Sequence, residues 1–105
     1  MPPKEVDITG NIKAIESLKV DLLTKTAALY DSLLKTTPQL SERGDILADM
    51  AIALYMLAGR LGIPCVTLDT TIANKLRRIV LDDASLTRQD GAYLLKHIEK
   101  REGLQ

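Results

Sequence analysis

One stretch decides the fold of this chain: ERGDILADMAIALYMLAGRLGI, residues Glu42–Ile63. Its apolar residues recur at three- and four-residue steps, at Leu47, Met50, Leu54, Leu57 and Leu61, which predicts a helix. The other faces of this helix are apolar as well, so we expect it to be buried on more than one side. Because the chain has only 105 residues, the second covering surface is expected to come from another subunit.

Residues that break or cap helices set the ends of this segment. The helix is expected to start near Pro38 or Ser41. It is expected to end between Gly59 and Gly62, because glycine supplies a C-terminal cap and Pro64 prevents the helix from continuing.

Three further segments have the same helical periodicity. In the first, about Ile8–Lys35, the apolar seam consists of Ile15, Leu18, Leu22, Leu29 and Leu33. The third helix is expected from about Leu68 to Leu81, with Thr67 as its N-cap, and the last from roughly Arg88 to Arg101. No segment alternates apolar and polar residues long enough to be a strand. The sequence therefore predicts an all-α protomer of four helices.

Composition is that of a small folded domain. The apolar fraction of 46% exceeds that of disordered chains, and the 14 basic residues are balanced by 14 acidic ones, which argues against nucleic acid as the partner. We expect a single domain over residues 1–105, with a core at about 8–81 and a C-terminal helix at about 87–101.

Compartment and membrane association follow from the cysteine content and the apolar runs. Cys65 is the only cysteine, so an internal disulfide is excluded, a buried structural thiol is expected, and a reducing cytoplasm fits. The N-terminus shows no secretion signal. The longest apolar run, Met50–Gly59, is too short to span a membrane.

Three carboxylates begin the apolar helix and form the first candidate site. Glu42, Asp45 and Asp49 have the spacing i, i+3, i+7, which aligns them along one stripe. Such a stripe suits a hard cation such as Mg²⁺, which prefers oxygen ligands. A structural alternative remains open: with Ser41 as N-cap, Glu42 and Asp45 lie near a helix N-terminus, where negative charge is favoured. That alternative does not account for Asp49.

Basic residues of the third helix form the second candidate site. Lys75 and Arg78 can bind a phosphate group, and Arg77 lies between them. The alternative is a solvated surface whose cations suit the C-terminal half of a helix.

The motifs resemble a known enzyme family. Glu42-Arg43-Gly44-Asp45-Ile46-Leu47, the long apolar helix ending Leu-Ala-Gly-Arg-Leu-Gly-Ile, and Lys75-Leu76-Arg77-Arg78 together resemble the MazG family of all-α nucleoside triphosphate pyrophosphohydrolases. The resemblance covers about residues 11–78. The opening segment, residues 11–23, is similar to the short MazG-like branch of spore-forming bacteria.

The resemblance implies Mg²⁺-dependent cleavage of a nucleoside triphosphate to monophosphate and pyrophosphate. The family's metal site uses Glu-Glu-x-x-Glu on one helix and Glu-x-x-Asp on the next. Glu42 and Asp45 match the second motif, whereas the first falls by register on Thr24, Lys25 and Ala28, none of which is acidic. Carboxylates from one helix leave a metal mostly hydrated, so we expect Mg²⁺ to be weakly held or absent.

Two functions are therefore expected to compete. The first is a divergent nucleotide pyrophosphohydrolase, weakly active or inactive, with a metal at Glu42, Asp45 and Asp49. The second is a non-catalytic helical protein for oligomerisation or for binding a nucleotide or phosphate near Lys75 and Arg78. In both cases we expect a MazG-like four-helix protomer whose helical bundle is completed by self-assembly, as a dimer or tetramer, through its first two helices.

Overall fold

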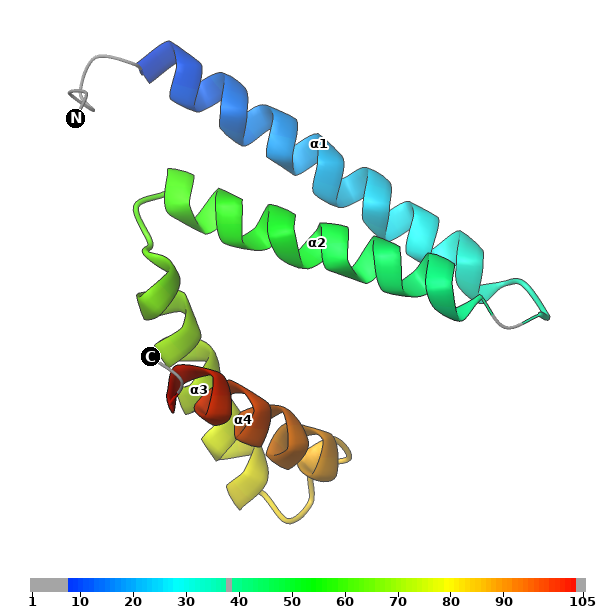
Figure 1. Ribbon diagram of the computed structural model, residues 1–105, viewed down its shortest axis with the longest axis vertical. Helices are drawn as coiled ribbons and strands as arrows, with labels where there is room; N and C mark the ends of the chain where they lie inside the picture. Colours follow the sequence, from blue (N-terminus) through cyan, green and yellow to red (C-terminus); the bar gives the residue numbers. More distant parts are fainter. Residues whose placement is uncertain (1–7, 38, 104–105) are drawn as a thin grey trace. The chain divides into compact units, whose positions relative to one another are not determined.

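The computed structural model describes residues 8–37 and 39–103, and this part of the chain consists of four α-helices without a strand (Figure 1). The helices are α1 (Ile8–Leu33), α2 (Leu40–Arg60), α3 (Cys65–Leu81) and α4 (Arg88–Gly103). The all-α fold with four helices is thus confirmed. The chain divides into two compact units, Met1–Ile63 with the hairpin of α1 and α2, and Pro64–Gln105 with the hairpin of α3 and α4.

The C-terminus of α2 is capped by glycine, as the sequence predicts. Gly62 has a positive φ of 89°, and its backbone N–H donates to the carbonyl of Gly59 at 3.1 Å. The N–H of Ile63 donates to the carbonyl of Ala58 at 2.8 Å. These two bonds form a Schellman motif, which satisfies carbonyls that the helix itself leaves without a partner.

The start of α3 corrects the sequence-based expectation. The helix begins at Cys65 rather than Leu68, and Pro64, not Thr67, is the N-cap residue. Proline is tolerated there because the first N–H groups of a helix have no intrahelical partner, and the Pro64 carbonyl accepts the N–H of Leu68 at 3.0 Å. Cys65 is exposed, so the expected buried thiol is wrong.

The first unit buries little apolar surface. Among its described residues, the buried hydrophobic ones are Ala53 and Ala58, while Met50 and Leu57 are half-buried. Several seam residues expected in the core are exposed, which corrects that prediction: Leu33, Leu47, Leu54 and Leu61. No single described helix is long and apolar enough to cross a membrane. The pair of α2 and α3 has the length and composition of a membrane span only when the two helices are taken together.

The second unit has a small core of its own. Ala73, Leu76 and Ile98 are buried there, and Ile72, Ile79 and Leu95 pack against them. Gly91 of α4 lies where the helices approach closely, because a Cβ at this position would be 2.9 Å from the Cγ2 methyl of Ile79. Two ion pairs join the hairpin at its surface, Arg77 with Glu99 at 3.2 Å and Arg101 with Asp69 at 3.1 Å.

Candidate functional site

An open groove lies between the two helices of the first unit. Its volume is about 360 Å³, near the lower end for small-molecule sites. The lining residues are Leu18, Asp21 and Lys25 from α1, and Asp49, Ile52, Ala53 and Met56 from α2. The lining thus combines four apolar side chains with three charged ones.

Lys25 of α1 forms an ion pair with Asp49, the carboxylate of the predicted stripe that lies farthest from the start of α2. Lys25 Nζ lies 3.3 Å from Asp49 Oδ2, and both side chains are roughly half-exposed. Asp21 stands one helical turn before Lys25 and lines the same groove. Two carboxylates and one ammonium group therefore line the same groove. The ammonium group of Lys25 occupies the position beside Asp49 that a metal cation would need.

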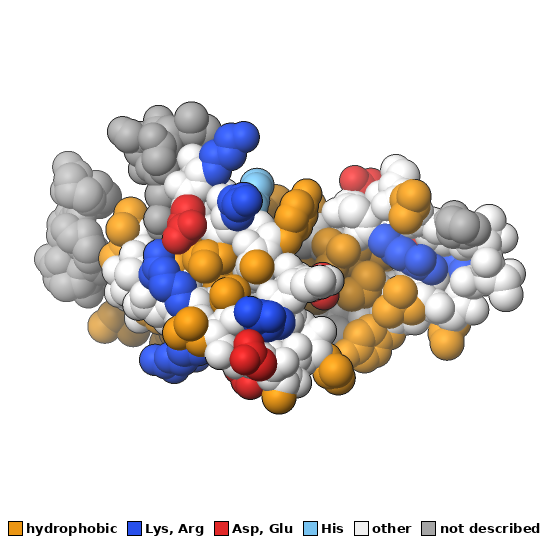
Figure 2. Space-filling model, turned by 90° about the horizontal axis from the view of Figure 1, so that it is seen from below, with side chains coloured by type: hydrophobic (Ala, Val, Ile, Leu, Met, Phe, Trp, Pro, Cys, Tyr) orange, Lys and Arg blue, Asp and Glu red, His pale blue; other side chains and the backbone are white. Residues whose placement is uncertain are grey.

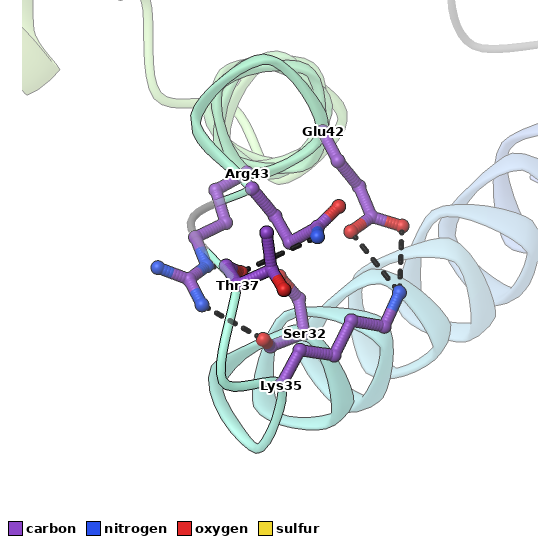
Figure 3. A network of polar contacts seen from close by, with 6 residues as sticks. Ser32, Lys35, Thr37, Glu42 and Arg43 are labelled. Carbon is purple, nitrogen blue, oxygen red and sulfur yellow. Dashed lines mark hydrogen bonds and ion pairs between the residues drawn. The ribbon is translucent and has the colours of Figure 1, made fainter.

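Glu42 is also paired with a lysine, which lies in the connection between α1 and α2 (Figure 3). Lys35 Nζ lies 3.3 and 3.4 Å from the two carboxylate oxygens of Glu42. The same turn is braced by Gln39, whose amide donates to the Thr37 carbonyl at 3.3 Å. Glu42 thus contributes to the connection between α1 and α2. Ser41 is not the N-cap expected from the sequence, because Gln39 holds that position.

Arg43 joins α2 to the C-terminus of α1 (Figure 3). Its Nε donates to the hydroxyl of Ser32 at 3.0 Å, and its Nη2 donates to the Ser32 carbonyl at 2.8 Å. Ser32 is buried. The Ser32 carbonyl also accepts the backbone N–H of Lys35 at 3.2 Å. The guanidinium group therefore adds a second bond to a carbonyl in the last turn of α1, and it also satisfies a buried hydroxyl.

The other end of the hairpin is joined by Arg60. Its Nη1 donates to the amide oxygen of Asn11 at 3.4 Å, and the Asn11 amide donates to the Arg60 carbonyl at the same distance. Arg60 thus links the C-terminus of α2 to the N-terminal part of α1.

The predicted metal ligands do not converge on one point. Glu42 and Asp49 each hold a different lysine, and Asp45 is exposed between them. Across residues 8–37 and 39–103, no group of three or more His, Cys, Asp or Glu side chains is placed to hold a metal ion. This donor set does not fit a firmly coordinated Mg²⁺, which needs several oxygens in near-octahedral geometry. Metal ligation by Glu42, Asp45 and Asp49 stays a prediction.

The basic residues of the second unit differ in their surroundings. Arg77 is held by the Glu99 carboxylate at 3.2 Å and by the Asn74 side-chain oxygen at 2.9 Å. Lys75 and Arg78 are exposed, and neither forms an ion pair with another described residue. They are therefore the cations of α3 that remain available to an anion.

The groove contains residues that sequence reasoning did not bring together. Asp21 lines the groove but is not among the site residues that the sequence predicts. The available signal was the i, i+4 spacing of Asp21 and Lys25, which places them on one face of α1. That this face meets Asp49 depends on how α1 is rotated against α2, which helical periodicity alone does not specify.

Comparison with known proteins identifies the family. The sequence model of the MazG-like family matches residues 8–94, which includes α1, α2, α3 and part of α4. No curated protein and no solved structure matches the chain. Since the match extends over most of its length, the chain belongs to the MazG-like family.

Proposed function

We propose that this protein is related to nucleotide pyrophosphohydrolases but has weak or no metal-dependent catalysis. The observation that carries the proposal is the ion pair between Lys25 and Asp49 in the groove. A positive side chain stands where the family's first acidic motif falls by register. Mg²⁺ would have to displace an ammonium group there and would find few oxygen ligands in return. Without a firmly placed ion, charge that develops on phosphate oxygens is poorly neutralised.

The direct test is pyrophosphate release from a panel of ribo- and deoxyribonucleoside triphosphates with Mg²⁺ or Mn²⁺. We expect release near the rate without protein, and no change in Glu42→Gln. The opposite outcome is metal-dependent release that Glu42→Gln abolishes. It would support the competing function, in which Glu42, Asp45 and Asp49 hold the ion together with carboxylates from a partner subunit.

A second candidate function is binding of a nucleotide or phosphate without cleavage. It is favoured by the exposed Lys75 and Arg78, which have no acidic partner among the described residues, whereas Arg77 is engaged by Glu99. The test is equilibrium titration with a fluorescent triphosphate in the absence of metal. Binding that is lost in Lys75→Ala/Arg78→Ala but retained in Arg77→Ala would support this function. Equal effects of both changes would count against it.

We further propose that the protein assembles with itself, as a dimer or tetramer, through α1 and α2. The support is the first unit's small core, whose buried hydrophobic residues among those described are two alanines. A helical hairpin with so little burial does not offset the entropy of folding by itself.

A further inference from the structure

The groove between α1 and α2 contains a carboxylate that no described residue neutralises. Asp21 lines the groove, and its carboxylate forms no hydrogen bond or ion pair with another residue of the described ranges. Asp49, the other carboxylate of the lining, is engaged by Lys25 at 3.3 Å. Two negative groups and one positive group leave the lining with a net charge of −1.

The two helices that form the groove run antiparallel. Asn11, near the start of α1, bonds to Arg60 at the end of α2. Ser32, in the last turn of α1, bonds to Arg43 in the first turn of α2. A step of one turn toward the start of α1 therefore corresponds to a step of one turn toward the end of α2.

An apolar surface lies across the groove from Asp21. Because Asp21 is one turn nearer the start of α1 than the ion pair, it lies opposite Ile52 and Ala53. One turn further, Leu18 lies opposite Met56. The groove therefore changes from charged at the ion pair to apolar at Leu18 and Met56 over two helical turns, about 11 Å.

We infer that this groove binds an organic cation with an apolar body, of the class of primary aliphatic amines, with its ammonium group at Asp21. The chain itself makes a contact of this kind, since the lysine side chain at Asp49 is an ammonium group on an aliphatic stem. A bound amine repeats that contact one turn along the groove. Its carbon chain then lies against Leu18 and Met56, where it is removed from water.

Charge and ligand chemistry distinguish an amine from a metal ion and from a nucleotide. The side chains opposite Asp21 supply no oxygen, whereas Mg²⁺ needs several oxygen ligands. A triphosphate without metal is repelled by the net negative charge of the lining. Apolar contact alone does not single out the groove, because hydrophobic side chains also lie elsewhere on the surface (Figure 2). The unpaired carboxylate beside an apolar surface is the combination that selects an amine.

This inference goes beyond the proposed function, which concerns nucleotides and metal ions. Amine binding is measured in the absence of both. Its failure would therefore leave the result of the pyrophosphate assay unchanged, and metal-dependent pyrophosphate release would not by itself exclude an amine.

Titration of the full chain with n-hexylamine at neutral pH, followed by nuclear magnetic resonance of the backbone amides, tests the ligand and its place. We expect shifts centred on residues 18–25 and 49–56. Hexylamine should bind at least about tenfold more tightly than methylamine, which has the charge without the chain. It should also bind more tightly than hexanoate, which has the chain with the opposite charge. Equal binding of hexanoate or methylamine, or shifts centred outside the groove, would overturn the inference.

Two substitutions test the charges of the groove. Asp21→Asn should weaken hexylamine binding about three- to fivefold, the range for an exposed ion pair. Asp31→Asn is the matched control, because Asp31 is an exposed carboxylate of α1 that does not line the groove. Lys25→Met should strengthen binding, because it removes a like charge and releases Asp49. Equal affinities of Asp21→Asn and Asp31→Asn, or no gain with Lys25→Met, would contradict an amine at Asp21.

Discussion

At the scale of single residues, Arg43 joins the two helices of the first unit through two hydrogen bonds to Ser32. Arg43→Ala removes two hydrogen bonds and leaves the buried Ser32 hydroxyl without this donor. We expect a loss of about 1–3 kcal/mol in the free energy of unfolding, as measured by urea denaturation.

Lys35→Ala is the control for this change, because it deletes an exposed ion pair at the same turn. Exposed pairs contribute at most about 1 kcal/mol, so Lys35→Ala should be nearly neutral. Similar losses for the two variants would mean that the turn, and not the guanidinium group of Arg43, stabilises the hairpin.

Lys25 is the positively charged residue of the groove lining, and replacing it with an acidic residue should create affinity for a cation. Lys25→Glu places a third carboxylate beside Asp21 and Asp49, which line the groove. Hard cations favour such oxygen-rich sites, so Mn²⁺ should bind at least about tenfold more tightly than to the natural chain in calorimetric titration.

Lys19→Glu provides the same change of charge on the same helix. Lys19 pairs with Glu16 at 3.0 Å and does not line the groove. If Lys19→Glu gains as much affinity as Lys25→Glu, the effect reflects net charge, and the groove has no special disposition for a metal.

At the scale of the helices, two glycines with different surroundings separate helix propensity from packing. Gly44 lies within α2 in open space, so Gly44→Ala should raise the free energy of unfolding by up to about 1 kcal/mol.

Gly91 of α4 is buried, and a Cβ there would be 2.9 Å from Ile79. Overpacking costs about 1–3 kcal/mol in the free energy of unfolding, whereas the higher helix propensity of alanine contributes up to about 1 kcal/mol. Gly91→Ala should therefore be neutral or destabilising. Thermal denaturation of both variants checks this, and clear stabilisation by Gly91→Ala would contradict the close approach of α3 and α4.

At the scale of the whole molecule, folding and self-assembly should be coupled. Because the described part of the first unit buries only two alanines among its hydrophobic residues, much of its stability would come from the surface between copies. The melting temperature should therefore rise by several degrees with each tenfold increase in protein concentration, as mass action requires for a dimer that dissociates on unfolding. If the melting temperature did not change between protein concentrations of about 1 and about 100 µM, a single chain would be stable alone.

The sequence by itself determined the helices and most of their ends. Periodicity at three and four residues specified the four segments, because the side chains of a helix repeat with its own geometry. The cap at Gly62 was also predictable from the sequence, because it depends on the backbone freedom of one residue. The start of α3 differs from the prediction because Thr67 is also a good capping residue, and because proline both ends helices and begins them, as Pro64 does here.

Only the tertiary structure decided which side chains meet between helices. The ion pair of Lys25 with Asp49 and the bonds of Arg43 to Ser32 join residues of α1 and α2. These contacts depend on the rotation and axial offset of one helix against the other. Several apolar faces of α2 satisfied the same periodicity, so the pattern did not distinguish Met50 and Leu57, which face the hairpin, from the exposed Leu47 and Leu54. Side-chain spacing specifies a face of a helix, whereas packing against a neighbour selects the face that is covered.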